Sequence, residues 1–410
     1  AESEDRGGIE ERILMSNPLL EALGNAKTSR NNNSSRFGKY IKLEFDAHNK
    51  IHSCEIENYL LEKSRVVSQN PMERNYHIFY MLCTGTDPAL RASLKLKDPM
   101  SYRFLSTSGC LTIDGVDDMA EFQDVQRAMN LLQIDESMQL DMFKLVSAAL
   151  TIGNIKFKKD DNDNAEVDGS EEEIKIAAEH LAIDETTFKS ALTEKSVMVG
   201  REMVTIKFNL NQADDSRDTV AKTLYGLMFD FTVKLLNKSL ANPNGGVSHP
   251  LHIGILDIFG FEIFEVNSFE QLCINFANEK LQLHFNSVIF GQEMKMYEEE
   301  GISLDKVDFV DNSLCVQLVE GKPLGLISLL EEECSLGGGT DLNYISKIDK
   351  TFGSGRKDEN PHFSKNRTKP NLFNVHHFAG VVEYCVDSWL DKNRDTLSPS
   401  VRQTMQESSK

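Results

Sequence analysis

Nine consecutive residues, NNNSSRFGK at positions 31–39, bring together three amides, two hydroxyls and two cations. Asn and Ser compete with the backbone for hydrogen bonds, so such a run favours a loop or a cap over a helix. Residues 40–45 alternate between apolar and polar types and predict a strand. A polar loop that leads into a strand can offer hydroxyls to a metal ion and amides to phosphate oxygens. A simple hairpin turn is the better explanation of five generic polar residues, but the complete string is far more specific.

The second segment, LHIGILDIFGFE at residues 251–262, combines an apolar run with two carboxylates. Its Ile and Leu residues predict a strand buried on both faces, as in a parallel sheet. Asp257 lies where that strand ends, and a carboxylate there is costly unless it is paired or near a metal ion. A Walker B strand has this arrangement, with its Asp holding nucleotide-bound Mg²⁺, and Gly260 leaves room for a backbone N–H to approach a γ-phosphate. An ordinary turn would explain D-x-x-G alone, but not D-x-x-G together with the Ser/Asn loop.

Two long helices are expected to position these segments. Residues 215–240 predict the first, and the turn-rich residues 241–250 separate it from the strand that follows. The first helix would present one apolar face: Val220, Leu224, Leu227, Met228, Phe231 and Leu235. Asn267 or Ser268 can cap the second helix in a capping box, and Gly291 predicts a bend further along it. The second helix would bury a stripe: Phe269, Cys273, Phe276, Ala277, Leu281, Phe285 and Val288.

Composition excludes several classes of protein. The 410 residues include 44 Lys and Arg against 64 Asp and Glu, a net charge of −20, whereas nucleic-acid binders and basic membrane-surface proteins depend on clustered positive charge. The longest nearly apolar run, residues 251–261, is too short to span a bilayer. Seven scattered cysteines without a C-x-x-C pair indicate reduced thiols, and the first residues do not resemble a signal peptide. We therefore expect a cytoplasmic protein that neither binds nucleic acid nor inserts into a membrane.

Together the two segments resemble the switch regions of the myosin motor domain. Residues 31–39 are similar to its switch I, and residues 257–262 are similar to its switch II. Kinesins share a shorter switch I core and a D-x-x-G, but they lack the Phe-Glu that follows here and the long segment behind it. The resemblance runs from end to end and includes NPLLEALGNAKT (17–28), YLLEKSR (59–65), NSFEQLCINFANEKL (267–281), LLEEEC (329–334), HHFAG (376–380) and WLDKN (389–393).

The resemblance implies ATP and Mg²⁺ as ligands and gives each matching residue a role. Ser35 would ligate Mg²⁺ directly, and Asp257 would do so through water. Arg36 and Glu262 would form an ion pair that closes the site and positions the attacking water. The residues that would contact the nucleotide phosphates or lie near that water are Asn31, Asn33, Ser34 and Gly260.

The fold implied by the resemblance is an α/β fold with a P-loop NTPase-type core, mainly helical around a mixed central sheet. Residues 1–46 would form a helix and the switch I segment at the nucleotide site. Residues 47–250 would form an upper 50-kDa-like subdomain. Residues 251–410 would supply switch II, the relay helix and a lower 50-kDa-like subdomain.

The implied function of the complete chain is an actin-activated Mg-ATPase that moves along actin filaments. Its partners would be the actin filament and, on a lever arm, light chains or calmodulin, within a myosin complex of the actin cytoskeleton. Glu202 precedes Asp218 of the DTVAK segment (218–222) by the spacing of the family's acidic or phosphorylated site on an actin-facing loop. A permanent carboxylate there would remove the need for phosphorylation. A solvated loop glutamate is the alternative interpretation.

One expected motif is missing, because no G-x-x-x-x-G-K-[ST] string occurs in the chain. The family's P-loop precedes switch I, and its converter and lever arm follow the segments matched here, so we expect an internal piece of a motor. Two alternatives stay open: an actin-binding pseudo-motor without nucleotide chemistry, and another P-loop switch such as a kinesin or a GTPase. Five switch residues that match the family argue against the pseudo-motor: Ser35, Arg36, Asp257, Gly260 and Glu262.

The missing P-loop predicts that the 410-residue chain by itself does not turn over ATP. A P-loop supplies the backbone cradle and the Lys that hold the β- and γ-phosphates, and switch residues that approach only the γ-phosphate cannot replace it. We expect a phosphate-release assay on the purified chain to detect no Mg²⁺-dependent ATPase activity. Measurable activity that is lost in Ser35→Ala would contradict this prediction.

Overall fold

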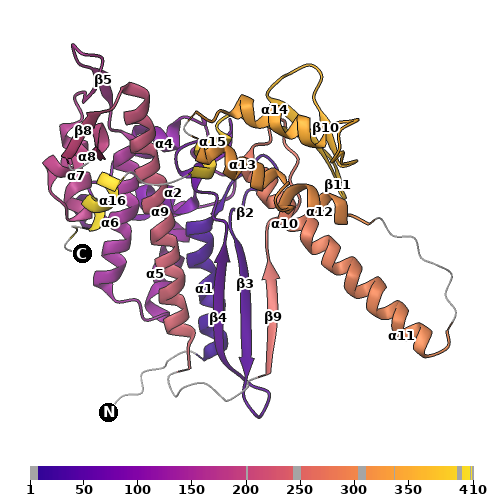
Figure 1. The fold of residues 1–410 in the computed structure, drawn as a ribbon. Helices are drawn as coiled ribbons and strands as arrows, with labels where there is room; N and C mark the ends of the chain where they lie inside the picture. Colours follow the sequence, from indigo (N-terminus) through magenta and orange to yellow (C-terminus); the bar gives the residue numbers. More distant parts are fainter. Residues whose placement is uncertain are drawn as a thin grey trace. The chain divides into compact units, whose positions relative to one another are not determined.

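Figure 1 shows the fold in a computed structural model, which describes residues 8–199, 202–242, 251–302, 311–336, 338–394, 399–406 and 408. The chain forms two compact units, Ala1–Ile258 with Thr396–Lys410, and Phe259–Asp395. Each unit has its own large cluster of buried apolar side chains. Within the described ranges, no helix combines the length and the apolar character needed to cross a bilayer.

Helices dominate the first unit, and several begin at side chains that accept hydrogen bonds from the first turn. Asp117 and Asp135 cap α5 and α6, and Asn209 forms a capping box with Gln212 at the start of α9. The helices are α1 (Ile9–Gly24), α2 (His77–Gly85), α3 (Pro88–Ser93), α4 (Arg103–Ser106), α5 (Asp118–Leu131), α6 (Glu136–Gly153), α7 (Glu171–Leu181), α8 (Glu185–Thr193), α9 (Leu210–Leu240) and α16 (Pro399–Gln406), with 3₁₀ turns η1 (Lys63–Val66) and η2 (Pro99–Ser101).

Strands of the first unit form three two-stranded hairpins and one three-stranded sheet. The hairpins pair β1 with β2, β5 with β6 and β7 with β8, and the sheet has the order β4–β3–β9. The strands are β1 (Asn25–Ala26), β2 (Ser34–Ser35), β3 (Gly38–Phe45), β4 (Ile51–Tyr59), β5 (Phe157–Lys159), β6 (Ala165–Val167), β7 (Glu194–Val199), β8 (Glu202–Lys207) and β9 (Leu251–Asp257). All of these pairs are antiparallel.

The strand predicted at residue 251 is present and ends at Asp257, but its predicted burial and parallel pairing are wrong. β9 pairs antiparallel with β3, and its apolar side chains are exposed, with Ile253 at 56% and Ile255 at 47%. Among the described strands β9 has one neighbour, and helices α1 and α9 pack on β4 at the other side of the sheet. The apolar run therefore reflects the preference of β-branched residues for strands. It does not indicate burial, because a buried parallel strand requires a covering layer on each face of the sheet.

Helix α9 begins earlier than its apolar pattern predicted, because Asn209 caps it. Its buried side packs against α1, α6 and β4 and includes Tyr225 and Phe229. Leu227 and Phe231, both predicted on the apolar face, are 60% and 40% exposed. An apolar residue on a long helix is buried only where a neighbouring element covers it.

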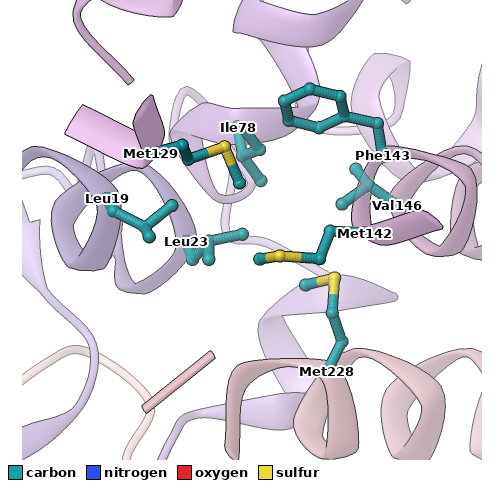
Figure 2. Close-up of a pocket in the computed structure, with 8 residues that line it drawn as sticks. All are labelled: Leu19, Leu23, Ile78, Met129, Met142, Phe143, Val146 and Met228. Atoms are coloured by element: carbon teal, nitrogen blue, oxygen red, sulfur yellow. The ribbon is translucent and has the colours of Figure 1, made fainter. Parts of the chain in front are cut away.

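A small cavity lies in the helical core of the first unit, between α1, α2, α5, α6 and α9 (Figure 2). Every side chain that lines it is apolar, so a water molecule there would lack hydrogen-bond partners. The cavity is a packing defect with no polar group that could recognise a ligand. Its lining residues are Leu19, Leu23, Ile78, Met129, Met142, Phe143, Val146 and Met228.

The second unit packs helices against an antiparallel sheet of order β10–β11–β12. Trp389 is fully buried at its centre, with ring centroids 5.5 Å from Phe269 and 5.6 Å from Phe373. Such tilted and edge-to-face aromatic contacts stabilise the packing beyond the area that each ring buries. The elements are α10 (Phe269–Asn286), π-helical η3 (Ser287–Gln292), α11 (Glu293–Glu299), α12 (Ser313–Glu320), α13 (Leu326–Ser335), α14 (Asp341–Phe352), α15 (Trp389–Arg394), β10 (Phe363–Lys365), β11 (Leu372–His377) and β12 (Gly380–Cys385).

The start of α10 confirms the predicted capping box: Ser268 is the N-cap, and its N–H donates to Gln271 Oε1 at 3.0 Å. The helix changes to π geometry over η3, which includes the predicted bend site Gly291. The predicted apolar stripe is wrong in its second half, because Leu281 is 37% and Phe285 54% exposed. The buried side of α10 is partly polar instead and includes Asn275 and Glu279, both fully buried.

Candidate nucleotide-binding site

The segment that resembles switch I, called switch I below, folds back on the end of α1 as part of a short hairpin. β1 and β2 pair antiparallel, and Asn31 closes the loop between them. The Asn31 carbonyl accepts a hydrogen bond from the Thr28 N–H (2.8 Å), and its Oδ1 accepts one from the Asn33 N–H (2.9 Å). Asn and Thr commonly stabilise turns in this way. The hairpin therefore has a defined conformation that its own polar side chains maintain.

The side-chain amide of Asn33, which was predicted to contact the nucleotide, forms hydrogen bonds with other residues of this chain. Its Oδ1 accepts from Asn25 Nδ2 (3.0 Å) and from the His77 ring at Nε2 (3.1 Å), while its Nδ2 donates to Glu21 Oε2 (3.0 Å). An amide oxygen can only accept, so His77 must carry its proton on Nε2. Burial, aided by the positive charge of Arg74, lowers the pKa of His77 to about 4. His77 is thus a neutral anchor of switch I, which sequence analysis missed because it lies outside every motif.

A ladder of alternating charges encloses the hairpin. Arg36 Nε and Arg65 Nε each donate to Glu62 Oε2 at 2.7 Å, and Arg65 also contacts Glu73 Oε2 at 3.0 Å. Glu73 Oε1 in turn accepts from the Ser29 N–H at the tip of the loop (3.1 Å). The ladder therefore contacts the hairpin both at the loop, through Ser29, and just after β2, through Arg36. Sequence analysis missed its acidic members, although the Glu–x–x–Arg spacing of residues 62–65 is a recognisable ion-pair signal.

Glu62 is the shared acceptor of this ladder. Burial by itself would raise the pKa of Glu62, but the attraction of Arg65 and Arg36 outweighs it and lowers the pKa to about 2. Glu62 therefore stays ionised at every physiological pH. Because Arg36 is only 2% exposed, its charge depends on such a partner.

The two serines of β2 differ in how their hydroxyls are used. Ser34 Oγ accepts a hydrogen bond from Arg36 Nη1 at 3.2 Å. Ser35 Oγ has no hydrogen-bond partner among the described residues, and its side chain is half-buried. An unpaired hydroxyl at the rim of the loop is the group that a hard cation such as Mg²⁺ accepts as a ligand.

Asp257 lies beside the end of switch I. The β3–β9 register places it opposite Lys39, and the Lys39 Nζ to Asp257 Oδ2 distance is 3.6 Å. The Asp257 carboxylate is 54% exposed, contrary to the expectation of a carboxylate at the end of a buried strand. Exposure leaves its oxygens accessible to water, which a water-mediated contact to a metal ion requires.

Gly260 and Glu262 belong to the second unit. A Cβ on Gly260 would meet no atom within 4 Å, so nothing in the described protein demands glycine there. The space is available to a ligand, as expected for a backbone that approaches a phosphate. Two amides of α10 hold the segment: Asn278 Nδ2 donates to the Phe259 carbonyl (3.0 Å), and Asn275 Oδ1 accepts from the Glu262 N–H (2.8 Å).

The predicted site residues are thus divided between the units. The first unit contains Asn31, Asn33, Ser34, Ser35, Arg36 and Asp257, and the described neighbour of Asp257 in switch I is Lys39. The second unit contains Gly260 and Glu262. The backbone of Glu202 starts β8, opposite Val199, but its side chain lies outside the described residues.

Comparison with known proteins identifies the class. A family model described as "Myosin head (motor domain)" matches residues 1–410, so the chain belongs to the myosin head family, with its P-loop NTPase-type α/β fold. This confirms the resemblance and the fold class that the switch motifs predicted.

Named relatives agree with this family. The chain is 43% identical over 402 residues to "Myosin-I heavy chain" of Dictyostelium discoideum, covering 97% of this chain and 17% of the relative. It is 43% identical over 390 residues to "Myosin-3" of Arabidopsis thaliana (95% and 33%) and 41% identical over 389 residues to "Unconventional myosin-Vc" of Homo sapiens (95% and 22%). The chain therefore spans between 17% and 33% of the length of these relatives.

The anchor role of His77 predicts a pH-dependent stability. Because the folded pKa of about 4 lies below the value of 6.5 for a free His, the unfolded chain binds more protons between these two pH values. Stability that is present above pH 6.5 should therefore decline as the pH falls towards 4, by up to about 3 kcal/mol from this residue.

Urea unfolding followed by circular dichroism at several pH values between 7 and 4 would measure this loss. His77→Gln keeps a donor for Asn33 but cannot titrate, so its unfolding free energy should fall less steeply than that of the wild type. Parallel pH profiles for the two proteins would contradict the anchor role.

Proposed function

We propose that this chain supplies the switch I and switch II segments of an actin-activated Mg-ATPase that drives movement along actin filaments. The observation that carries the proposal is the β3–β9 register, which aligns Lys39 with Asp257 and so joins the end of switch I to the start of switch II. Membership of the myosin head family supports the same function.

Three features of the described residues fit ATP and Mg²⁺ as ligands. Ser35 has an unpaired hydroxyl, Asp257 has an exposed carboxylate, and Gly260 has open space beside its backbone. In the proposed site Ser35 holds Mg²⁺ directly and Asp257 holds it through water. When bound, Mg²⁺ would neutralise charge on the phosphate oxygens.

Positioning and electrostatics are the contributions that phosphoryl transfer needs from a protein. In the proposed mechanism Asn31, Asn33 and Ser34 line the phosphates, and the Gly260 N–H donates to a γ-phosphate oxygen. To contact the nucleotide, the Asn33 amide would exchange part of its hydrogen bonds to Asn25, Glu21 and His77 for hydrogen bonds to the phosphates. Arg36 and Glu262 close the site as an ion pair, which excludes bulk water and orients the attacking one.

The remaining parts of the motor belong to the proposal as well. The actin filament is the proposed partner, and the P-loop, the converter and a lever arm with light chains or calmodulin would be supplied by segments other than the residues described. Residues 47–250 and 251–410 would act as the upper and lower 50-kDa-like subdomains, and the protein would belong to the actin cytoskeleton in the cytoplasm. A pseudo-motor would bind actin without hydrolysing ATP, so an ATPase assay on the full-length protein separates the two functions.

The proposed Arg36–Glu262 ion pair, called the latch below, predicts that hydrolysis requires opposite charges at these two positions. Arg36 and Glu262 are 2% and 8% exposed, and an unpaired buried charge costs about 3–5 kcal/mol. In the full-length motor, Arg36→Glu and Glu262→Arg should each slow hydrolysis by about two to three orders of magnitude while ATP still binds. The double exchange should recover a substantial part of the hydrolysis rate, measured by quenched flow.

Glu62 requires a control in this experiment, because it also pairs with Arg36 and would repel a glutamate at that position. All variants should therefore be repeated in a Glu62→Gln background, where the repulsion is absent. Losses that add independently in both backgrounds, with the fold and ATP binding intact, would show that Arg36 and Glu262 are not a latch.

Glu202 is proposed to face actin, from its spacing to Asp218. In the full-length motor, Glu202→Ala should lower the actin-activated ATPase rate and leave the basal rate unchanged, because the residue would contact actin and not the nucleotide. Glu202→Asp, which keeps the charge, is the matched control. Equal loss of the basal and the activated rates would contradict the proposed location.

A further inference from the structure

A fully buried amide holds the backbone on both sides of Glu262. Asn275, one turn and a half into α10, accepts a hydrogen bond from the Glu262 N–H at Oδ1 (2.8 Å). Its Nδ2 donates to the Glu262 carbonyl at the same distance. A side-chain amide that satisfies both polar groups of one residue mimics a strand neighbour, so Glu262 cannot rotate its peptide planes without breaking a buried hydrogen bond.

A third hydrogen bond sets the orientation of the Asn275 amide. Its Nδ2 also donates to the hydroxyl of Tyr384 (2.9 Å), which lies against Nε2 of His377 (2.9 Å). His377 Nδ1 lies 2.8 Å from Glu279 Oε2. Asn275, Tyr384 and Glu279 are fully buried, so water cannot replace a missing partner.

The chain of donors and acceptors has one arrangement that satisfies every group. An ionised Glu279 can only accept hydrogen bonds, so His377 carries a proton on Nδ1 and donates a hydrogen bond to Glu279. The Tyr384 hydroxyl accepts a hydrogen bond from Asn275 Nδ2 and can therefore donate one to Nε2 of His377. If the Asn275 amide were flipped, its NH₂ group would face the Glu262 N–H, donor against donor.

Glu279 is the fixed end of this chain. Burial by itself would raise the pKa of Glu279, but hydrogen bonds from His377 and Asn312 outweigh it and lower the pKa. Asn312 Nδ2 donates to Glu279 Oε1 at 2.7 Å, and the Phe378 N–H donates to Oε2 at 3.2 Å. Cys315 completes a group of three potential metal ligands within 4.8 Å of one another, but these hydrogen bonds already satisfy the carboxylate.

We propose that Asn275 is a positioning residue for the hydrolysis step, and that Tyr384, His377 and Glu279 fix the orientation of its amide. The proposal rests on the proposed function, in which Glu262 closes the site and orients the attacking water. Asn275 would act through the Glu262 backbone and would touch neither nucleotide nor water. The role is therefore distinct from that of the switch residues themselves.

Two readouts in the full-length motor test the proposal. Asn275→Ala should slow the hydrolysis step in single-turnover quenched flow by about 10- to 100-fold, with the ATP-binding rate unchanged. Without nucleotide, it should also speed hydrogen–deuterium exchange of the peptide that contains the Glu262 amide by about tenfold or more. Gln282→Ala is the matched control, because Gln282 is an amide of the same helix whose one hydrogen bond among the described residues is to Asn286, and it should change neither quantity.

Tyr384→Phe tests the supporting chain and remains informative if Asn275→Ala does not fold. It removes one hydroxyl, so it should produce smaller changes of the same kind, in hydrolysis and in exchange. Added to Asn275→Ala, it should have no further effect on hydrolysis, because Tyr384 would act only through Asn275. Wild-type hydrolysis and exchange in either folded single variant would overturn the proposal.

The two proposals fail in different ways. If the wild-type motor hydrolyses ATP and folded Asn275→Ala does so at the same rate, the positioning role is wrong and the proposed function stands. If the wild type itself does not hydrolyse ATP, the proposed function is wrong, and with it the role of Asn275 in hydrolysis. The exchange measurement then decides only whether Asn275 holds the Glu262 backbone.

Discussion

Antiparallel pairing of β3 with β9 is the constraint on which the candidate site depends. The last two switch I residues are the first two of β3, and β9 ends at Asp257, so opposite strand directions bring these two ends to the same edge of the sheet. A parallel arrangement would place them at opposite edges. A slip of one residue would turn Asp257 to the other face of the sheet and remove it from Lys39. The backbone ladder thus sets the position of a carboxylate that is far from switch I in the chain.

Buried charge is balanced in both units, and this balance stiffens the segments around the site. In the first unit the ladder of Arg36, Glu62, Arg65 and Glu73 alternates in sign and ends on the backbone of the switch I loop. In the second unit the buried carboxylate of Glu279 lies within hydrogen-bonding distance of His377, Asn312 and the Phe378 N–H. Removing one member of such a network leaves a buried group without a partner, which costs more than the bond contributes. Both networks therefore favour one conformation of the segments they hold.

Local sequence patterns were reliable where the deciding interactions are local. The capping box at Ser268 forms because its partner lies three residues away, and the strand ends at Asp257 as its composition indicated. Burial patterns were less reliable. Leu227, Ile255 and Phe285 are exposed although each fits an apolar pattern, because no neighbouring element of the described chain covers them. Conversely, the polar Asn275 and Glu279 are buried, because partners far along the chain satisfy them.

The sequence by itself determined the family, the two switch motifs and the residue types available for phosphate and metal contacts, since these follow from the order of side chains along short segments. Only the tertiary structure decided that Glu62 pairs with Arg36, that His77 anchors Asn33, and that Asn275 holds Glu262. Each of these contacts joins residues between 13 and 44 positions apart. Their formation depends on how helices and strands pack, because a hydrogen bond requires a distance near 3 Å that a one-dimensional pattern does not encode.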